Sequence, residues 1–139
     1  MNELFVYGTL RDPEYRLALF DRALPARPAL LADWVAVMAE TGYLTLLSAP
    51  GESVSGELLA LDDAALALAD AWEEVPVYER RQVAARDADG NAVTAYVYVR
   101  PTASRERAPA GMLAQHPREH VLAQIRALRS HARMSNERA

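Results

Sequence analysis

The turn composition of residues 87–91 constrains the fold more strongly than any other stretch of the chain. Its sequence, Asp-Ala-Asp-Gly-Asn, separates two alternating segments, Glu79 to Arg86 and Ala92 to Val99. A cluster of Asp, Gly and Asn between two such segments is typical of a β-hairpin. We therefore expect an antiparallel pair of strands over these two segments.

Further strands are predicted before this hairpin. Runs rich in β-branched, Leu and aromatic residues cover residues 4–7, 29–38, 43–47 and 54–61. Clusters of Gly, Pro and Ser separate them, and the Ser-Ala-Pro-Gly sequence at 48–51 is interpreted as one of these turns. Together with the hairpin, these runs predict a sheet of about six strands.

Helices are predicted where an aspartate and the residues after it mark a helix start. Asp12 followed by Pro13 is typical of an N-cap and a first helical position, and predicts a helix to about residue 24. Asp62 predicts the N-cap of a second helix over 63–74, which is rich in Ala and Leu. The apolar spacing near the carboxyl end predicts a third helix over about 117–134.

These elements fit a single α+β domain over residues 1–139. The chain has 139 residues, of which 51% are hydrophobic, and a domain of this size buries roughly two-thirds of its unfolded surface. The predicted strands are enough to curl a mixed sheet into a small open β-barrel with flanking helices.

Composition argues against several classes of function. The chain has no cysteine, which removes disulfides, thiolate catalysis and Cys-ligated metals. A net charge of −4 argues against nucleic-acid binding, which normally needs a basic face. No stretch approaches the roughly 20 apolar residues of a membrane span, and the Met-Asn-Glu start is unlike a signal peptide. We expect a soluble, cytoplasmic protein with no membrane or nucleic-acid partner.

The first strand ends abruptly at a turn made of Tyr7, Gly8 and Thr9, which we expect to be exposed, and Leu10 follows it. Gly8 permits a positive φ or a close backbone approach to a ligand. The amides of Gly8, Thr9 and Leu10 could therefore converge on an anion. The alternative is that this turn only reverses the chain.

Three segments in order carry a resemblance to a known family. They are the Tyr-Gly-Thr-Leu sequence at 7–10, the Val-Ser-Gly-Glu-Leu strand at 54–58, and the helix end at 68–74 followed by Tyr-Glu-Arg at 78–80. Over about residues 4–100 the chain resembles the gamma-glutamylcyclotransferase-like family. It departs from the family pattern at Ala69, at Trp72, where Tyr is usual, and at Glu74, where Gly is usual.

The resemblance implies a small mixed β-barrel and an enzyme that cyclises a gamma-glutamyl group to 5-oxoproline, with release of an amine, amino acid or peptide. The chemistry it implies needs neither metal nor cofactor, because the substrate's own α-amine is the nucleophile. Carried over to this sequence, Glu73 is the proton shuttle. The implied substrate-binding residues are Tyr7, Gly8, Thr9 and Leu10 in the turn, with Tyr78 and Tyr98 lining the pocket.

Helix geometry favours Glu73 over Glu74 for this role. Glu73 shares a helix face with Leu66 and Ala69, whereas Glu74 shares its face with Asp70. Apolar neighbours and the negative end of the helix dipole should raise the pKa of the Glu73 carboxyl. The alternative is a surface ion pair between Glu73 and one of the arginines at 80 and 81.

Other readings of the chain remain open or are disfavoured. The same pocket could bind a small carboxylate or amide without turnover, or the basic carboxyl-terminal helix could bind a protein partner. The His-Pro-Arg-Glu-His sequence at 116–120 matches an inverted zinc-protease motif, but Pro117 should place His116 before the helix and off the face of His120. The arginines at 126, 129 and 133 are interpreted as a solvated face. The sequence names neither the leaving group nor the oligomeric state.

Overall fold

A computed structural model describes residues 1–73, 77–109 and 111–138, with side chains of the last helix described as far as residue 131. Within these residues the strands are β1 (Asn2–Val6), β2 (Ala26–Met38), β3 (Leu44–Leu61), β4 (Glu79–Asp87) and β5 (Ala92–Val99). The α-helices are α1 (Pro13–Phe20), α2 (Asp63–Trp72) and α3 (Arg118–Arg138), and a short 3-10 turn covers Thr9–Arg11. The predicted α+β class is confirmed.

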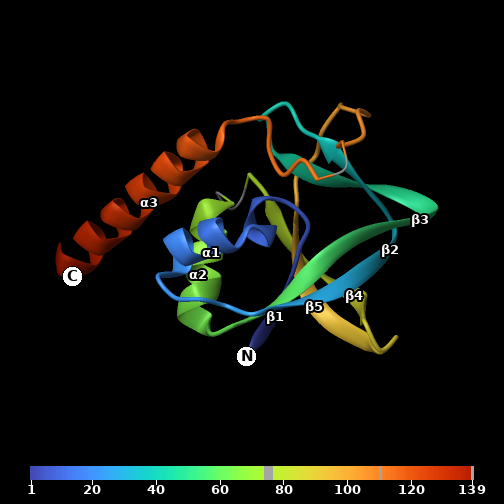
Figure 1. The fold of residues 1–139 in the computed structure, drawn as a ribbon, viewed down its shortest axis with the longest axis horizontal. Coiled ribbons are helices and arrows are strands. Elements are labelled where there is room, and N and C mark those ends of the chain that lie inside the picture. The colour runs from blue at the N-terminus through green and yellow to red at the C-terminus, as the bar shows by residue number, and fades with distance from the viewer. Residues whose placement is uncertain (74–76, 110, 139) are drawn as a thin grey trace.

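The strands form a closed barrel in the order β1-β3-β2-β4-β5 (Figure 1). Neighbouring strands are antiparallel except where β5 meets β1, and that parallel contact pairs Leu4 with Tyr96. The sheet is therefore mixed, as predicted, but the barrel is closed where an open one was expected. The hairpin of β4 and β5 around residues 87–91 is confirmed, with Arg86 opposite Ala92.

The described residues contain five strands, because two of the expected strands form one continuous strand. The expected strand 43–47, from residue 44 on, and the expected strand 54–61 belong to the single strand β3, which continues through the Ser-Ala-Pro-Gly sequence. The β2–β3 register breaks between the pairs Ala32↔Ser53 and Trp34↔Ser48. At this irregularity Asp33 and Gly51 have φ of 70° and 85°, and the Gly51 amide donates to Asp33 Oδ1 at 3.0 Å. The Pro-Gly signal marks a bulge in a long hairpin, not a chain reversal.

Both predicted N-caps are confirmed. The Asp12 side chain accepts hydrogen bonds from the amides of Glu14 at 2.9 Å and Tyr15 at 3.4 Å, at the start of α1. The Asp62 side chain accepts from Ala65 N at 2.8 Å at the start of α2. Helix α1 ends at Phe20, earlier than expected, because Asp21 adopts a left-handed conformation with φ of 58°. The predicted end of the second helix at residue 74 lies outside the described residues.

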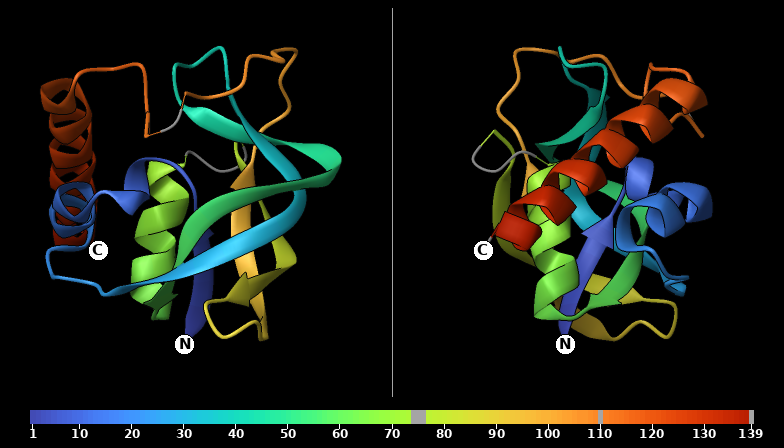
Figure 2. Two further views of the ribbon diagram at one scale, coloured as in Figure 1. Left: turned by 45° about the vertical axis from the view of Figure 1, so that its right-hand side comes forward. Right: turned by 90° about the vertical axis from the view of Figure 1, so that its left-hand side faces the viewer.

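The three helices pack together on one side of the barrel (Figure 2). Side chains of β1 alternate, so that Leu4 and Val6 belong to the core beneath the helices, while Phe5 and Tyr7 belong to the core of the barrel. Helix α3 joins the first of these cores through Val121, Leu122 and Ile125. Tyr7 and the turn directly after β1 therefore lie at the boundary between the two cores.

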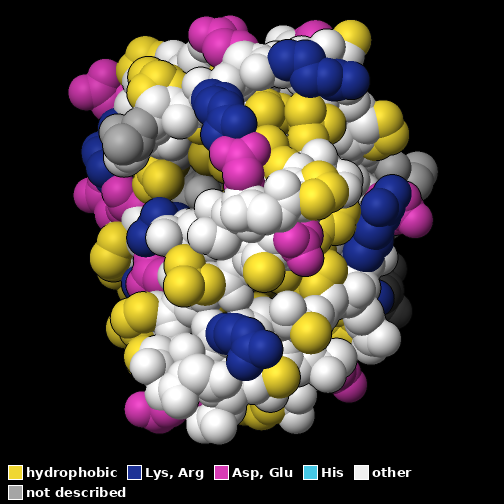
Figure 3. All heavy atoms as spheres, turned by 90° about the vertical axis from the view of Figure 1, so that its right-hand side faces the viewer, with side chains coloured by type: hydrophobic (Ala, Val, Ile, Leu, Met, Phe, Trp, Pro, Cys, Tyr) yellow, Lys and Arg dark blue, Asp and Glu magenta, His cyan; other side chains and the backbone are white. Residues whose placement is uncertain are grey.

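On the barrel face opposite the helices, arginine side chains lie among acidic ones (Figure 3). Arg107 forms an ion pair with Glu52 on the barrel surface. Among the described residues, no helix is long and apolar enough to span a bilayer.

Candidate active site

A cavity of about 340 Å³ lies where the end of β1, the end of α2 and helix α3 meet. Its lining is mostly apolar and aromatic, with Phe5, Tyr43, Leu44 and Trp72 among the contributing side chains. Every residue that the sequence selected for the site lines this one cavity: Tyr7, Gly8, Thr9, Leu10, Glu73, Tyr78 and Tyr98. Segments from both ends of the domain therefore line a single cavity.

Glu73 caps the carboxyl end of α2, where its amide donates to Ala69 O at 2.9 Å. Burial raises the pKa of its carboxyl to about 8. The direction agrees with the sequence prediction, and the cause is removal from water. No hydrogen bond or ion pair to the Glu73 carboxyl is found among the described residues.

The alternative ion pair of Glu73 is not what the structure shows. Arg80 Nη1 instead bonds Asp70 at 2.9 Å, and Arg81 Nη2 bonds Glu79 at 3.1 Å. Glu74 lies outside the described residues, so its position relative to the cavity is not described. Glu73 thus lines the cavity without an ion pair to either arginine.

Most of the turn at residues 7–10 is buried, with Gly8 half-buried, where exposure of Tyr7, Gly8 and Thr9 was expected. Thr9 is 6% exposed and Leu10 is 2% exposed. The amide of Arg11 donates to Gly8 O, and the amide of Asp12 donates to Thr9 O, each at 3.0 Å. Among the described residues, no acceptor is found for the amides of Gly8, Thr9 and Leu10, which all line the cavity.

Of the two uses that the sequence leaves open for Gly8, a positive φ and a close approach to a ligand, Gly8 does not adopt the first. Its φ is −120°, and a Cβ built on it would lie 3.8 Å from Leu44 Cβ, which is an ordinary contact. The chain reverses here through the 3-10 turn that follows, so the turn needs no left-handed residue. A close approach of ligand to the Gly8 backbone remains a prediction, because Gly8 lines the cavity.

Hydroxyl groups of three tyrosines are fixed around the cavity. Tyr7 OH donates to the backbone oxygen of Tyr98 at 2.5 Å, and Tyr78 OH donates to Leu44 O at 3.3 Å. Tyr98 OH donates to Asp70 Oδ1 at 2.6 Å. Burial, with the Glu73 charge as a smaller cause, raises the pKa of all three phenols. These phenols therefore stay protonated at neutral pH and can serve as hydrogen-bond donors.

Sequence reasoning missed the partner of Thr9. The indole Nε1 of Trp72 donates to Thr9 Oγ1 at 3.1 Å, and its ring meets Tyr43 edge to face at 6.0 Å. Trp72 was noted only as a departure from the family pattern. The two residues lie 63 positions apart, so no local signal could have paired them.

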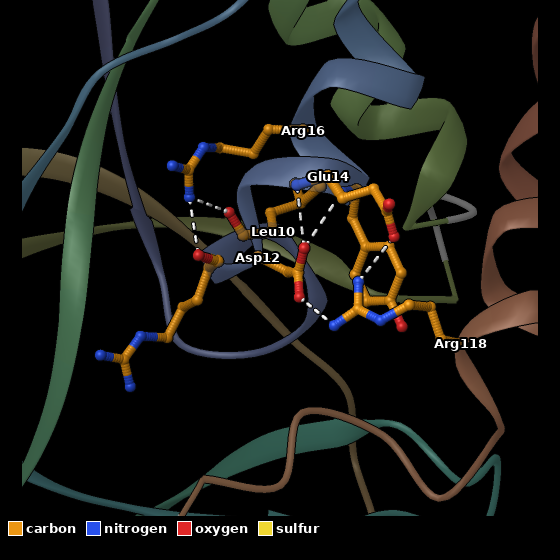
Figure 4. Close-up of polar contacts among 7 residues, drawn as sticks. Leu10, Asp12, Glu14, Arg16 and Arg118 are labelled. Carbon is orange, nitrogen blue, oxygen red and sulfur yellow. Dashed lines mark hydrogen bonds and ion pairs between the residues drawn. The ribbon is translucent and has the colours of Figure 1, made fainter.

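Helix α3 also contributes to the lining, although the resemblance ended near residue 100. Gln124, Ala127 and Leu128 face the cavity. The amino end of α3 is held on α1 by Arg118, which forms ion pairs with Asp12 at 2.5 Å and Glu14 at 2.9 Å (Figure 4). The apolar spacing of α3 predicted a helix, but it could not indicate which part of the domain that helix covers.

His116 and His120 lie closer together than their expected placement on different sides of the helix start implied. His116 precedes α3, as predicted, but its ring stacks on His120 with centroids 4.7 Å apart. Its Nε2 lies 2.9 Å from Thr41 O, which places this histidine against the 39–43 loop. Among the described residues, no group of three or more His, Cys, Asp or Glu side chains could hold a metal ion.

The arrangement suits proton transfer next to an anion. Glu73, a carboxyl of raised pKa, lines the same cavity as the unbonded amides of the turn. A group that bridged the two would meet a proton acceptor at one side and hydrogen-bond donors at the other.

Comparison with known proteins locates this fold. A family model described as gamma-glutamyl cyclotransferase, AIG2-like, matches residues 4–118. The crystal structure of an AIG2-like protein from Mus musculus is similar, with a TM-score of 0.65 and 25% identity over 86% of this chain and 97% of that one. A solution structure from Arabidopsis thaliana has a TM-score of 0.64 and 21% identity, over 99% of this chain and 83% of that one. No curated protein matches the chain.

A structure named gamma-glutamyl cyclotransferase has the same fold. Its TM-score is 0.63 and its identity 18%, over 73% of this chain and 67% of that chain.

Proposed function

The chain belongs to the gamma-glutamyl cyclotransferase, AIG2-like family, and we propose that it is an enzyme that cyclises a gamma-glutamyl group to 5-oxoproline. The observation that carries the proposal is the placement of Glu73 and the 7–10 turn on the lining of one cavity. The substrate would be a small gamma-glutamyl conjugate of an amine, an amino acid or a peptide.

The reaction needs no nucleophile from the protein. The α-amine of the glutamyl group attacks its own side-chain amide carbon, so that a new C–N bond closes a five-membered lactam. The bond from that carbon to the leaving nitrogen breaks, and the proton lost by the α-amine ends on the leaving amine. Holding the substrate in the ring-closing geometry can supply several kcal/mol of the rate enhancement.

Glu73 is the proposed proton shuttle. In its ionised form it accepts a proton from the attacking amine, and it then returns that proton to the leaving nitrogen. A pKa of about 8 brings the affinity of this carboxyl for protons closer to that of an amine. The absence of a cationic partner among the described residues leaves the carboxyl free to exchange its proton with the substrate.

The turn is the proposed anion site. The amides of Gly8, Thr9 and Leu10 would donate to the substrate's carboxylate or to the oxyanion that develops on the amide carbon. Tyr7, Tyr78 and Tyr98 would complete the walls, because their side chains line the cavity with protonated hydroxyls already anchored to fixed acceptors.

A screen of gamma-glutamyl amines, amino acids and peptides for 5-oxoproline release tests the proposal. We expect turnover of at least one class, lost in Glu73→Gln and retained in Glu79→Gln, whose carboxylate is on the barrel surface paired with Arg81. Binding of such compounds without 5-oxoproline release would favour the alternative, a non-catalytic carboxylate or amide binder on the same fold.

A further inference from the structure

Arg16 is a buried cation that the proposed mechanism does not use. It lies on α1 and is 6% exposed, yet no acidic side chain pairs with it among the described residues. Its Nη1 donates to Leu10 O at 3.0 Å and to Arg11 O at 2.8 Å, and its Nε is buried without a hydrogen-bond partner among those residues (Figure 4). Its hydrogen bonds therefore go to the last residue of the 7–10 turn and to the residue directly after it.

The two carbonyls that Arg16 binds begin two chains of hydrogen-bonded peptide groups. Leu10 O belongs to the peptide whose N–H, on Arg11, donates to Gly8 O. Arg11 O belongs to the peptide whose N–H, on Asp12, donates to Thr9 O.

The far ends of these chains are the cavity amides. The peptide group of Gly8 O carries the N–H of Thr9, and the peptide group of Thr9 O carries the N–H of Leu10. Hydrogen bonds in series polarise one another, so a cation at one end makes the N–H groups at the other end stronger donors.

Burial and the position in the helix both disfavour a cation here. Burial without a counter-ion is costly, and the amino-terminal part of a helix disfavours positive charge. The nearby carboxylates of Asp12 and Glu14 are bound by Arg118. The contacts with the turn are thus the interactions that compensate for burying Arg16.

We propose that Arg16 is a positioning residue: through Leu10 O and Arg11 O it holds the 7–10 turn and strengthens the Thr9 and Leu10 amides as anion donors. This inference rests on the proposed function for its catalytic consequence. Arg16 does not line the cavity and so acts only through the backbone.

Arg16→Met, Arg16→Lys and the control Arg22→Met test the inference. Arg16→Met removes the charge and the hydrogen-bond donors while keeping a side chain of similar size. Arg16→Lys keeps a cation with several hydrogens on one nitrogen. The control residue Arg22 pairs with Asp62 on the surface. We expect Arg16→Met to lose about 10-fold or more in kcat/KM, because small displacements of binding groups cost that much. Arg16→Lys should recover part of the loss, and Arg22→Met should match the wild type.

An amide NMR spectrum separates this inference from the proposed function. In Arg16→Met the Thr9 and Leu10 amide protons should move upfield, and their response to added 5-oxoproline should need about 10-fold more ligand. The amides of Glu14 and Tyr15, bound by Asp12, should stay in place. The apparent pKa seen in the pH profile should also be unchanged.

The outcomes are distinguishable. If the wild type releases no 5-oxoproline from any gamma-glutamyl compound, the proposed function fails, and the amide resonances still decide the role of Arg16. If folded Arg16→Met keeps the wild-type Thr9 and Leu10 resonances and its kcat/KM within about two-fold, the inference is overturned, since that is far below the cost of misplacing donors. Should Arg16→Met not fold, Arg16→Gln, a neutral donor, replaces it with the same expected results.

Discussion

The indole N–H of Trp72 donates to the hydroxyl oxygen of Thr9 at 3.1 Å, and this bond joins the end of α2 to the turn after β1. Glu73 follows Trp72 directly, so this contact lies next to the residue that carries the carboxyl. A side-chain hydrogen bond therefore connects two segments that are far apart in the chain.

Trp72→Phe should weaken this connection while keeping the aromatic contact with Tyr43. We expect a loss of about 1 kcal/mol in the free energy of unfolding, typical of one hydrogen bond, together with a lower kcat/KM. Thr9→Val should cost a similar amount, and the double variant should cost less than the sum, as urea unfolding would show. Trp34→Phe, on β2 away from the cavity lining, is the control; equal losses of kcat/KM in both tryptophan variants would contradict the role given to Trp72.

Glu73→Gln should remove turnover and leave the fold intact. Loss of a single acid-base group typically costs ~10² to 10⁴ in rate. In the wild type, kcat/KM should rise as the pH passes through about 8, because the ionised carboxyl is the base. Steady-state rates from pH 6 to pH 9.5 measure this. A profile governed by an ionisation at or below the ordinary glutamate value of ~4.3 would contradict the assignment.

The same carboxyl should make stability depend on pH. Its pKa rises from about 4.3 in the unfolded chain to about 8 in the folded one, so the folded protein binds the extra proton between these values. The free energy of unfolding should therefore fall as pH rises across this window. Glutamine does not titrate, so the free energy of unfolding of Glu73→Gln, relative to that of the wild type, should increase from pH 5 to pH 8.5. A constant difference in urea unfolding would count against a buried Glu73.

Local signals account for the parts of the fold that were predicted correctly. The turn residues 87–91 predict a hairpin, and Asp12 and Asp62 predict helix starts, because hairpin turns and N-caps depend on residues a few positions apart. The bulge near Gly51 could not be told from a turn, since its conformation depends on Asp33 across the hairpin. The closed barrel likewise depends on the distant pair of Leu4 and Tyr96.

The features of the candidate site also divide into those that local sequence signals predict and those that depend on contacts across the fold. The position of Glu73 at the end of a helix with apolar neighbours could be derived from spacing, and the family motif supplied the turn. Contacts made across the fold could not be predicted, among them the bond from Trp72 to Thr9 and the burial of Arg16. Gly8 does not use the positive φ that a glycine permits, because the chain reverses through the 3-10 turn after it.

Gly8→Ala should act on ligand binding. The added Cβ meets only ordinary contacts with Leu44 and Leu113, and Gly8 belongs to the lining of the cavity. We expect a folded protein with a raised KM. Gly51→Ala is the matched control, because Gly51 has φ of 85° and open space around it. That variant should lose about 1 kcal/mol of stability with unchanged KM. An unchanged KM in Gly8→Ala would mean that ligand does not approach this backbone.

Removal of Arg118 should reduce the stability of the α1–α3 contact in a pH-dependent way. The Arg118 guanidinium is the largest cause that lowers the pKa of the Asp12 carboxyl in the folded protein. This stabilisation is present above the unfolded value of ~3.9 and is lost as pH falls through the folded value. Arg118→Met should therefore be less stable than the wild type at pH 7, with a difference that shrinks as pH falls below the unfolded value of ~3.9. Asp12→Asn keeps a cap acceptor and should abolish the effect of Arg118→Met on pH dependence.

Helix α3 should influence which leaving group the cavity accepts. Gln124 and Leu128 line the cavity from a helix that is held by Arg118 and by the buried side chains of Val121 and Ile125. Glu73 and the turn are expected to hold the glutamyl part, which leaves this wall for the group that departs. Leu128→Ala should therefore change kcat/KM more for bulky leaving groups than for small ones, as competing-substrate rates would show. Arg126→Ala, outside the lining, should change neither, and an equal effect of Leu128→Ala on all substrates would place the leaving group elsewhere.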